Sequence, residues 1–190
     1  MRIAPSILII LLLVTGCQEI RVGMRMKRFT SHKVVFPESL IKVQGRDSND
    51  VDLSIDVPRL VVYVDSSDCS SCRLNNLMYY TDYASLSKVF PVFQFFVIIF
   101  PDSESEDNII KNISHRSFPF DVFVDLEGAF SKKNPFLPQR DSRYHCFLLD
   151  WDQHPSMVGD PTSSRKLDVL FNKTFNQIIT KQLNVVLFRA

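Results

Sequence analysis

The sequence predicts an α/β fold in which a central mixed β-sheet is flanked by helices. Continuous apolar runs of strand length, bounded by proline, serine or aspartate, alternate with stretches in which apolar residues recur at helical spacing. Sixteen phenylalanines in strand-like and helix-like runs indicate a sizeable core. The alternation of strands with helices favours one layered domain rather than two.

The amino-terminal segment has the layout of a secretory signal peptide. A basic start, Met1-Arg2, precedes an apolar run over Ile7–Val14 and the small residues before Cys17. A membrane-spanning helix needs about 20 apolar residues, so this shorter run is expected to be cleaved rather than to span the bilayer. Residues 1–16 are therefore predicted as the signal peptide.

Val14-Thr15-Gly16-Cys17 resembles the lipobox of bacterial lipoproteins, in which the cysteine is acylated and becomes the first residue of the mature chain. The resemblance implies lipid attachment at Cys17, and several acyl chains would give stable anchoring. Residues 17–33 are then the anchor and tether, and residues 34–190 form the domain. The alternative is an ordinary secretory signal followed by an unrelated cysteine.

The charge balance of the mature chain is neutral. Removing residues 1–16 takes away Arg2 and no acid, so 22 − 1 = 21 basic side chains face 21 acidic ones. A protein that binds nucleic acid is usually strongly basic, and nothing in this composition indicates such a partner.

The first half of the chain contains one strand and one helix of clear pattern. We expect a buried strand over Leu60–Val64, and a helix after Cys72 that ends before Pro91. Other expected elements are an irregular lead-in at Gln18–Arg28, short strands at Val34–Phe36 and Leu40–Val43, and a half-buried strand formed by the alternating Val51, Leu53, Ile55 and Val57.

The second half continues the alternation. The strongest strand is expected over Val92–Phe100, and a helix from Pro101 to about His115 has acids in its first turn, where the helix dipole favours them. The remaining expected elements are a strand at Asp121–Val124, an irregular stretch through Asn134–Pro138, a buried strand at Cys146–Asp150, its hairpin partner at Met157–Gly159, and a last helix capped by Ser163 or Ser164 with the apolar face Leu167, Leu170, Phe171, Phe175, Ile178 and Ile179.

Cys69 and Cys72 form a C-x-x-C pair directly after the buried strand. Their spacing alone is weak evidence, but Cys69 would lie at the amino terminus of the following helix. Unpaired backbone N–H groups and the helix dipole stabilise a thiolate there. Cys69 is therefore expected to attack a disulfide, and Cys72, one turn further on, to resolve the mixed disulfide. Asp68 opposes ionisation of Cys69, and Arg73 partly offsets that effect.

This order of elements resembles the thioredoxin-like fold. From about Val34 to about Gln182 the chain is similar to the membrane-anchored thioredoxin-like oxidoreductases of bacterial envelopes. The matching segments are the active-site strand and motif at Leu60–Cys72, the next strand at Phe93–Phe100, and the strand before an Asp-terminated turn at Cys146–Asp150. The resemblance implies that the first cysteine of the motif is the nucleophile and the second is the resolving thiol.

The chain departs from that family just before the late strand. The family usually has a cis-proline there, whereas this sequence has Tyr144, His145 and Cys146, and Pro119 lies one element too early. Tyr144, His145 and Cys146 are therefore candidates for the substrate-facing position. Cys146 has three interpretations: a third redox thiol, a metal ligand, or a simply buried residue.

Four other interpretations are open. A zinc site could assemble from Cys69, Cys72, Cys146 and His145, since zinc takes about four nitrogen or sulfur ligands. Copper delivery would favour a wider cysteine spacing with a dedicated histidine. A peroxidase would need one low-pKa cysteine in a peroxide pocket. Lastly, a non-catalytic lipoprotein domain could keep a static Cys69–Cys72 disulfide and act in binding or scaffolding.

The sequence therefore predicts a lipid-anchored thiol:disulfide oxidoreductase of the bacterial cell envelope, with its domain in the periplasm. Its expected partners are protein thiols or disulfides, with a membrane redox partner as an option, and neither a metal nor another cofactor is expected. The direction of exchange depends on the reduction potential of the pair, and known pairs span about 150 mV.

Overall fold

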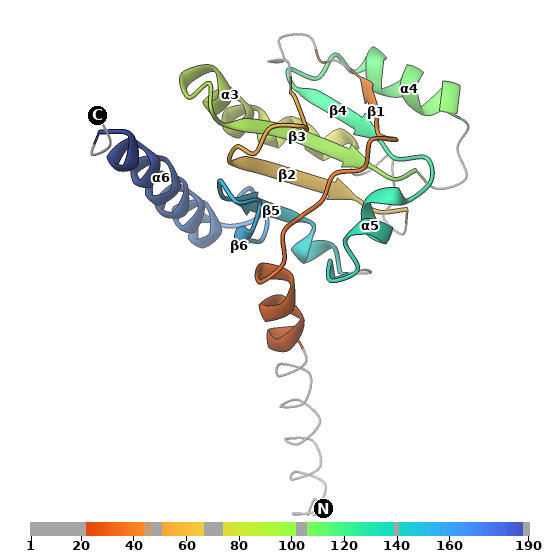
Figure 1. Cartoon of the computed structure of the whole chain (residues 1–190). Coiled ribbons are helices and arrows are strands. Elements are labelled where there is room, and N and C mark those ends of the chain that lie inside the picture. Colours follow the sequence, from red (N-terminus) through yellow and green to blue (C-terminus); the bar gives the residue numbers. More distant parts are fainter. Residues whose placement is uncertain are drawn as a thin grey trace, which may run out of the picture.

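One mixed sheet forms the centre of the molecule (Figure 1). The computed structural model describes residues 22–43, 45, 51–66, 74–101, 106–138 and 141–187, with side chains up to residue 181. The strands are β1 (Ile41–Val43), β2 (Arg59–Val64), β3 (Gln94–Ile99), β4 (Asp121–Val124), β5 (Cys146–Leu149) and β6 (Pro155–Val158). Their order in the sheet is β1-β4-β3-β2-β5-β6. Strands β2, β3 and β4 are parallel, and β1, β5 and β6 are antiparallel to their neighbours.

Strand β2 lies between β3 and β5 and is buried on both faces. All six of its residues are buried, as are all six of β3, which explains why both strands are continuous apolar runs rather than alternating ones. The parallel register pairs Leu60 with Phe95 and Val64 with Ile99. The carboxyl end of β2 therefore opens at the same edge of the sheet as the carboxyl ends of β3 and β4.

Helices cover both faces of the sheet. They are a helix over residues 22–30, η1 (Leu77–Tyr80), α3 (Thr81–Val89), α4 (Glu106–His115), α5 (Ala129–Lys133), η2 (Ser142–Tyr144) and α6 (Arg165–Leu187). Side chains from η1, α3, α4 and α6 join Val62 and Val64 in what we name the first core cluster. Phe29 and Phe130 join Val61 and Tyr63 in the second core cluster, on the opposite face. Alternate residues of β2 thus point into the two clusters.

Most expected elements of the second half are confirmed. Strand β4 has the expected bounds, β5 and β6 form the expected hairpin, and α4 ends at His115 as expected. Ser164 caps α6, since its Oγ accepts a hydrogen bond from the Leu167 backbone N–H at 3.4 Å. The expectation that Leu170 belongs to the apolar face of α6 is wrong, because its side chain is 44% exposed.

Four expectations for less regular segments are wrong. Residues 22–28 of the expected irregular lead-in are helical. Helix α5 lies between Val124 and Asn134, where an irregular stretch was expected to follow the strand. Residues 34–36 form no strand. Residues 51–57 also form no strand, despite their alternation.

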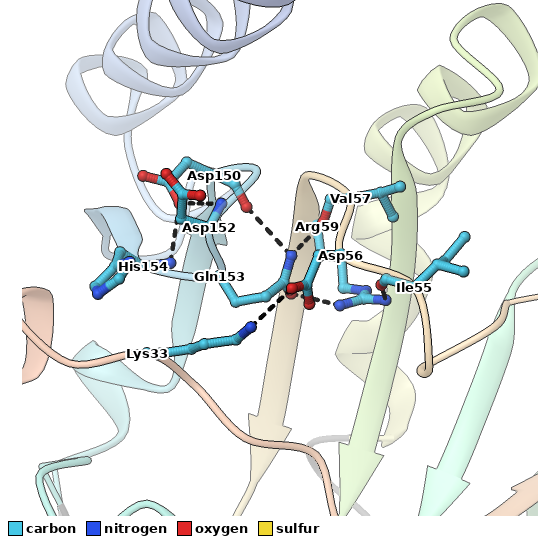
Figure 2. Close-up of polar contacts among 9 residues, drawn as sticks. All are labelled: Lys33, Ile55, Asp56, Val57, Arg59, Asp150, Asp152, Gln153 and His154. Atoms are coloured by element: carbon cyan, nitrogen blue, oxygen red, sulfur yellow. Dashed lines mark hydrogen bonds and ion pairs between the residues drawn. The ribbon is translucent and has the colours of Figure 1, made fainter.

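A buried arginine explains the conformation of residues 51–57. Arg59, the first residue of β2, is 0% exposed, and its Nη2 donates to the backbone carbonyl oxygens of Asp52, at 2.9 Å, and of Ile55. Gln153 Nε2 donates to the carbonyl oxygen of Val57 at 2.8 Å. The backbone of this segment thus bonds to side chains instead of to a neighbouring strand, as Figure 2 shows for its second half.

The Arg59 guanidinium also bonds to side chains on both sides of β2. Its Nε donates to Gln94 Oε1 at 2.9 Å, its Nη1 donates to Gln153 Oε1, and its plane lies 5.1 Å from the Phe36 ring centroid. Burial lowers the pKa of Arg59 to about 10, and the charges of Asp56 and Asp52 oppose that shift. The cluster fixes the amino end of β2, at the opposite edge of the sheet from the end that leads to Cys69.

Candidate functional site

The predicted cysteine pair lies between the carboxyl end of β2 and the following helix. Strand β2 ends at Val64, and the next described residues, 74–76, are helical, with Leu74 buried. Cys69 and Cys72 lie in residues 67–73, outside the described residues, as does Cys17. The described flanks thus attach the pair to the carboxyl edge of a central parallel strand, the edge at which open α/β sheets bind their ligands.

A cavity of about 240 Å³ lies beside the end of β2. Its walls come from β2, η1, the start of β5 and the loop after β6. The residues that give it chemical character are Tyr80, Cys146, Asp160 and Thr162. The cavity therefore combines an apolar floor from the sheet with one polar wall.

The groups of this polar wall interact with one another. The Tyr80 hydroxyl interacts electrostatically with the side chains of Cys146, Asp160 and Thr162. Asp160 Oδ1 accepts from the backbone N–H and from the hydroxyl of Thr162, both at 2.8 Å, which fixes the carboxylate beside the cavity. Burial, with the charges of Cys146 and Asp160, raises the pKa of Tyr80 far above its ordinary value, so the hydroxyl stays protonated.

Cys146 is the first residue of β5 and faces the first core cluster. Its side chain is 2% exposed, and its Cα pairs with that of Val62. Burial, and secondarily the charge of Asp160, raises the pKa of the Cys146 thiol well above its usual range, although the bond to Tyr80 lowers it in part. A buried protonated thiol is a poor nucleophile and a poor metal ligand. These observations favour the interpretation of Cys146 as a packed core residue.

His145 points to the other face of the sheet. Its ring packs edge-on against Tyr63 with centroids 5.2 Å apart, and its Nε2 lies 3.0 Å from the Pro138 carbonyl oxygen. Because a carbonyl oxygen only accepts, Nε2 is the donor in this bond. The His145 backbone oxygen accepts from the Tyr63 N–H at 2.7 Å. His145 thus connects the loop at Pro138 to β2, and its ring lies on the face of the sheet opposite to the Cys146 side chain.

Tyr144 is half-buried at the end of η2, and Arg143 lies over its ring at 5.5 Å. His145 and Cys146 both border the cavity, although their side chains pack on opposite faces of the sheet, and Tyr144 does not border it. Within the described part of the chain, no group of three or more His, Cys, Asp or Glu side chains is arranged to hold a metal ion. The zinc alternative would need His145 and Cys146 to turn toward each other.

The peptide bonds near the late strand are trans. No cis peptide bond occurs in the described residues, and His145 occupies the position directly before β5. Pro119 precedes the amino end of β4, and since β4 and β2 run parallel through β3, this end lies at the edge opposite the carboxyl end of β2. Pro119 therefore cannot take the place of the missing proline.

Sequence reasoning missed the polar wall of the cavity. Tyr80 lies eight residues after Cys72, and Asp160 follows β6, so neither adjoins the motif in sequence. One signal was available, since Asp160-Pro161-Thr162 places two turn-forming polar residues directly after the expected hairpin. A separate finding concerns the membrane: none of the helices in the described residues has both the length and the apolar character needed to cross a bilayer.

Comparison with known proteins gives structural neighbours only. No protein-family model matches the sequence. No curated protein matches it either. Among solved structures, a candidate protein disulfide isomerase from Bacteroides thetaiotaomicron superposes with a TM-score of 0.50 at 13% identity, covering 73% of this chain and 86% of that one.

Two further structures are similar at lower scores. A candidate thiol:disulfide interchange protein DsbE from Chlorobium tepidum has a TM-score of 0.49 at 16% identity, covering 77% of this chain and 94% of that one. The exposed lipoprotein thioredoxin Etrx1 from Streptococcus pneumoniae has a TM-score of 0.44 at 17% identity, covering 68% of this chain and 98% of that one. The topology and the first of these likenesses show that the chain has the predicted thioredoxin-like fold.

Proposed function

We propose that this chain is a thiol:disulfide oxidoreductase of the bacterial cell envelope that acts through Cys69 and Cys72. The observation that carries the proposal is the place of the C-x-x-C motif on the sheet. It follows the carboxyl end of the central strand β2 and precedes the helical residues 74–76 of a thioredoxin-like fold. The expected substrates are protein thiols or disulfides.

In the reducing direction, the Cys69 thiolate attacks one sulfur of a substrate disulfide and the other substrate sulfur leaves as a thiolate. Cys72 then attacks Cys69 Sγ, which releases the second substrate thiolate and leaves a Cys69–Cys72 disulfide. The substrate gains two electrons and the pair loses two, so a membrane redox partner would have to reduce the pair again. The reverse sequence would oxidise a substrate dithiol.

The structure of the flanks supports different roles for the two cysteines. Cys72 lies two residues before Leu74, which is buried in the first core cluster, so the chain turns inward after the motif. Cys69 lies closer to Ser66, which is only half-buried. Cys69 is therefore assigned as the thiol that meets the substrate, and Cys72 as the resolving thiol.

Lipid attachment at Cys17 belongs to the same proposal. The chain from Cys17 to residue 33 would connect the acyl group to the domain of residues 34–190, in the periplasm. The test is a Cys17→Ser chain, which should lose the acyl mass and leave the membrane fraction. Retention of the protein in the membrane fraction without the acyl mass would contradict the assignment of Cys17.

The activity is tested by two measurements on the same proteins: the reduction potential of the Cys69–Cys72 pair and the rate of insulin reduction. The wild type should reduce insulin, Cys69→Ala should lose that activity, and Cys146→Ala should retain both rate and potential. A Cys72→Ala variant should accumulate the mixed disulfide with substrate, because the resolving thiol is gone.

The second candidate function is non-catalytic. The specific observation in its favour is His145, which occupies the position before β5 where the resembled family has its substrate-binding proline. In that case the wild type would show no insulin reduction, and the potential would lie below about −300 mV, the range of structural disulfides. That result would favour a binding or scaffolding domain.

A further inference from the structure

Two segments of the described chain carry only positive charge. Residues 22–33 contain Arg25, Lys27, Arg28 and Lys33 and no acid, and residues 129–138 contain Lys132 and Lys133 and no acid. In a chain with 22 basic and 21 acidic side chains, this is a local excess of six cations. The excess matters only if the two segments meet in space.

The fold does bring them together. The helix over residues 22–30, drawn orange-red in Figure 1, packs on the domain through Met26 and Phe29, and the Phe29 ring lies 5.2 Å from that of Phe147. The His32 ring stacks on Phe136 with centroids 3.8 Å apart. Between this helix and residues 131–138 lies an open groove of about 540 Å³, and none of the described residues that line it is acidic.

The cations around this groove are available for a partner. Arg25 and Arg28 line it with Lys132, and all three side chains are exposed. Lys33 pairs with Asp56 at 2.7 Å, and the Lys132 ammonium donates to the Glu127 backbone oxygen. In the described residues, Arg25, Lys27, Arg28 and Lys133 have no acidic partner. We name Arg25, Lys27, Arg28, Lys132 and Lys133 the basic surface.

Apolar side chains are exposed among these cations. Met24 is 55% exposed on the same helix, and Phe136 is exposed beside the groove. Cations interspersed with exposed apolar side chains are typical of surfaces that lie in the interface of an anionic bilayer, where the charges meet headgroups and the apolar groups enter the acyl boundary. A site for one small anion would instead enclose it with buried donors, whereas these cations are exposed and spread along an open groove.

We propose that the basic surface docks the domain onto a membrane that contains anionic phospholipids. The length of chain before the helix fits this occupant. Five residue steps separate Cys17 from Val22, and an extended chain spans at most about 3.6 Å per residue, so the helix would start within about 18 Å of an acylated Cys17. The charge argument stands without the acyl group, although the anchor would strengthen the docking.

Docking in this way would orient the domain. The basic surface lies with the second core cluster, on the face covered by the helix of residues 22–30 and α5, whereas Tyr80 and Cys146 of the cavity wall belong to the first core cluster. The polar wall of the cavity would then lie on the side of the sheet away from the bilayer.

The test uses the mature chain, residues 17–190, with Cys17→Ser so that no acyl group contributes. The partition coefficient is measured by sedimentation with two kinds of vesicle. One contains phosphatidylcholine alone, and the other contains about 30% phosphatidylglycerol as the anionic lipid. The variant is Arg25→Gln with Arg28→Gln. The matched control is Lys166→Gln with Lys173→Gln, which removes the same charge from exposed positions on α6, on the other face. Circular dichroism checks that each variant is folded.

We expect binding to the anionic vesicles only, and loss of binding in high salt. Each cation near an anionic surface contributes about fivefold in partitioning, so the Arg25/Arg28 variant should bind about 25-fold more weakly, with the control unchanged. Equal binding to neutral vesicles, equal loss in the control, or no binding at all would overturn the proposal. Competition by millimolar inorganic phosphate at constant ionic strength would overturn it in favour of a small-anion site. Insulin reduction is a separate readout that these variants should leave unchanged.

Discussion

Val62 and Cys146 are directly opposed in the antiparallel ladder between β2 and β5. Both side chains enter the first core cluster, so a buried thiol lies next to the strand that leads to the proposed redox pair. Tyr80, whose hydroxyl interacts with the Cys146 thiol, belongs to the helical segment that follows the same pair. The chemistry of Cys146 can therefore be separated experimentally from that of Cys69 and Cys72.

The first prediction concerns alkylation. After mild reduction, iodoacetamide should modify Cys69 and Cys72, while Cys146 stays unmodified until denaturant is added, because it is 2% exposed and protonated. Peptide mass spectrometry of samples quenched over time measures the three rates. Labelling of native Cys146 at a rate comparable to that of Cys69 would contradict its burial and restore the third-thiol interpretation.

The second prediction concerns stability at alkaline pH. The unfolded Cys146 thiol titrates at its ordinary pKa of 9.0, and burial raises the pKa in the folded state. Above pH 9 the unfolded chain releases a proton that the folded chain keeps, so rising pH favours unfolding. The loss of unfolding free energy should reach about 1.4 kcal/mol by pH 10.

Urea denaturation of the oxidised protein at pH 8, 9 and 10 measures this loss, with Cys146→Ala as the comparison. The variant lacks the titrating thiol, so its unfolding free energy should fall less between pH 9 and 10. Buried Tyr80 and Tyr63, whose pKa values are raised chiefly by burial, act in the same direction as the pH approaches and passes 10, but they do so in both proteins. Parallel curves for the two proteins would contradict the assignment.

The third prediction concerns the polar wall of the cavity. Tyr80→Phe removes one buried hydroxyl that interacts with Cys146, Asp160 and Thr162, and should lower the unfolding free energy by about 1 kcal/mol. Tyr79→Phe is the matched control, since the Tyr79 side chain is 71% exposed and the substitution should change stability little. Equal effects of the two substitutions in chemical denaturation would mean that the wall contributes nothing to stability.

The central sheet could be predicted from the sequence because its strands are long apolar runs with clear boundaries. Strands β2, β3 and β4 are buried on both faces, so burial alone determines their pattern. The alternation of residues 51–57 wrongly predicted a strand there. Arg59 and Gln153 donate hydrogen bonds to the backbone oxygens that would otherwise pair with a neighbouring strand. The local spacing of apolar residues cannot predict a hydrogen bond between Gln153 and Val57, which are about 100 positions apart.

The candidate site was predictable only in its local part. The place of Cys69 and Cys72 after a buried strand follows from the sequence alone, and the orientation of Cys146 follows from the period of β5 once its register is known. Tyr80 and Asp160 meet only because η1 packs on one face of the sheet, beside the loop that follows β6. Such convergence depends on tertiary structure, which single-sequence patterns do not contain.

The fourth prediction concerns Arg59. Arg59→Met keeps the apolar stem but removes the guanidinium. The buried Gln94 and Gln153 side-chain oxygens, and the part-buried carbonyl oxygens of Asp52 and Ile55, then lose their donor. We expect a loss of about 3 kcal/mol in unfolding free energy. Lys33→Met is the control, because the Lys33–Asp56 pair is exposed and such pairs contribute about 0 to 1 kcal/mol. A small effect of Arg59→Met would mean that residues 51–57 find other partners.

The last prediction compares two adjacent residues of α6. Both Leu170 and Phe171 were expected on its apolar face, but Phe171 is 0% exposed and packs against Phe175 and Tyr83, with ring centroids 5.7 and 5.0 Å away. Phe171→Ala should therefore cost about 3 to 5 kcal/mol, since it leaves a cavity in the first core cluster. Leu170→Ala should stay within about 0.5 kcal/mol.

Trp151 gives a direct readout for this comparison. It is the one tryptophan of the chain, and its indole N–H donates to the Ile178 carbonyl oxygen at 3.2 Å, so its fluorescence reports whether α6 is docked. Under urea, the midpoint of the Trp151 transition should fall strongly in Phe171→Ala and remain near the wild-type value in Leu170→Ala. If the Leu170 variant lost as much stability as the Phe171 variant, α6 would pack on the sheet through a different face.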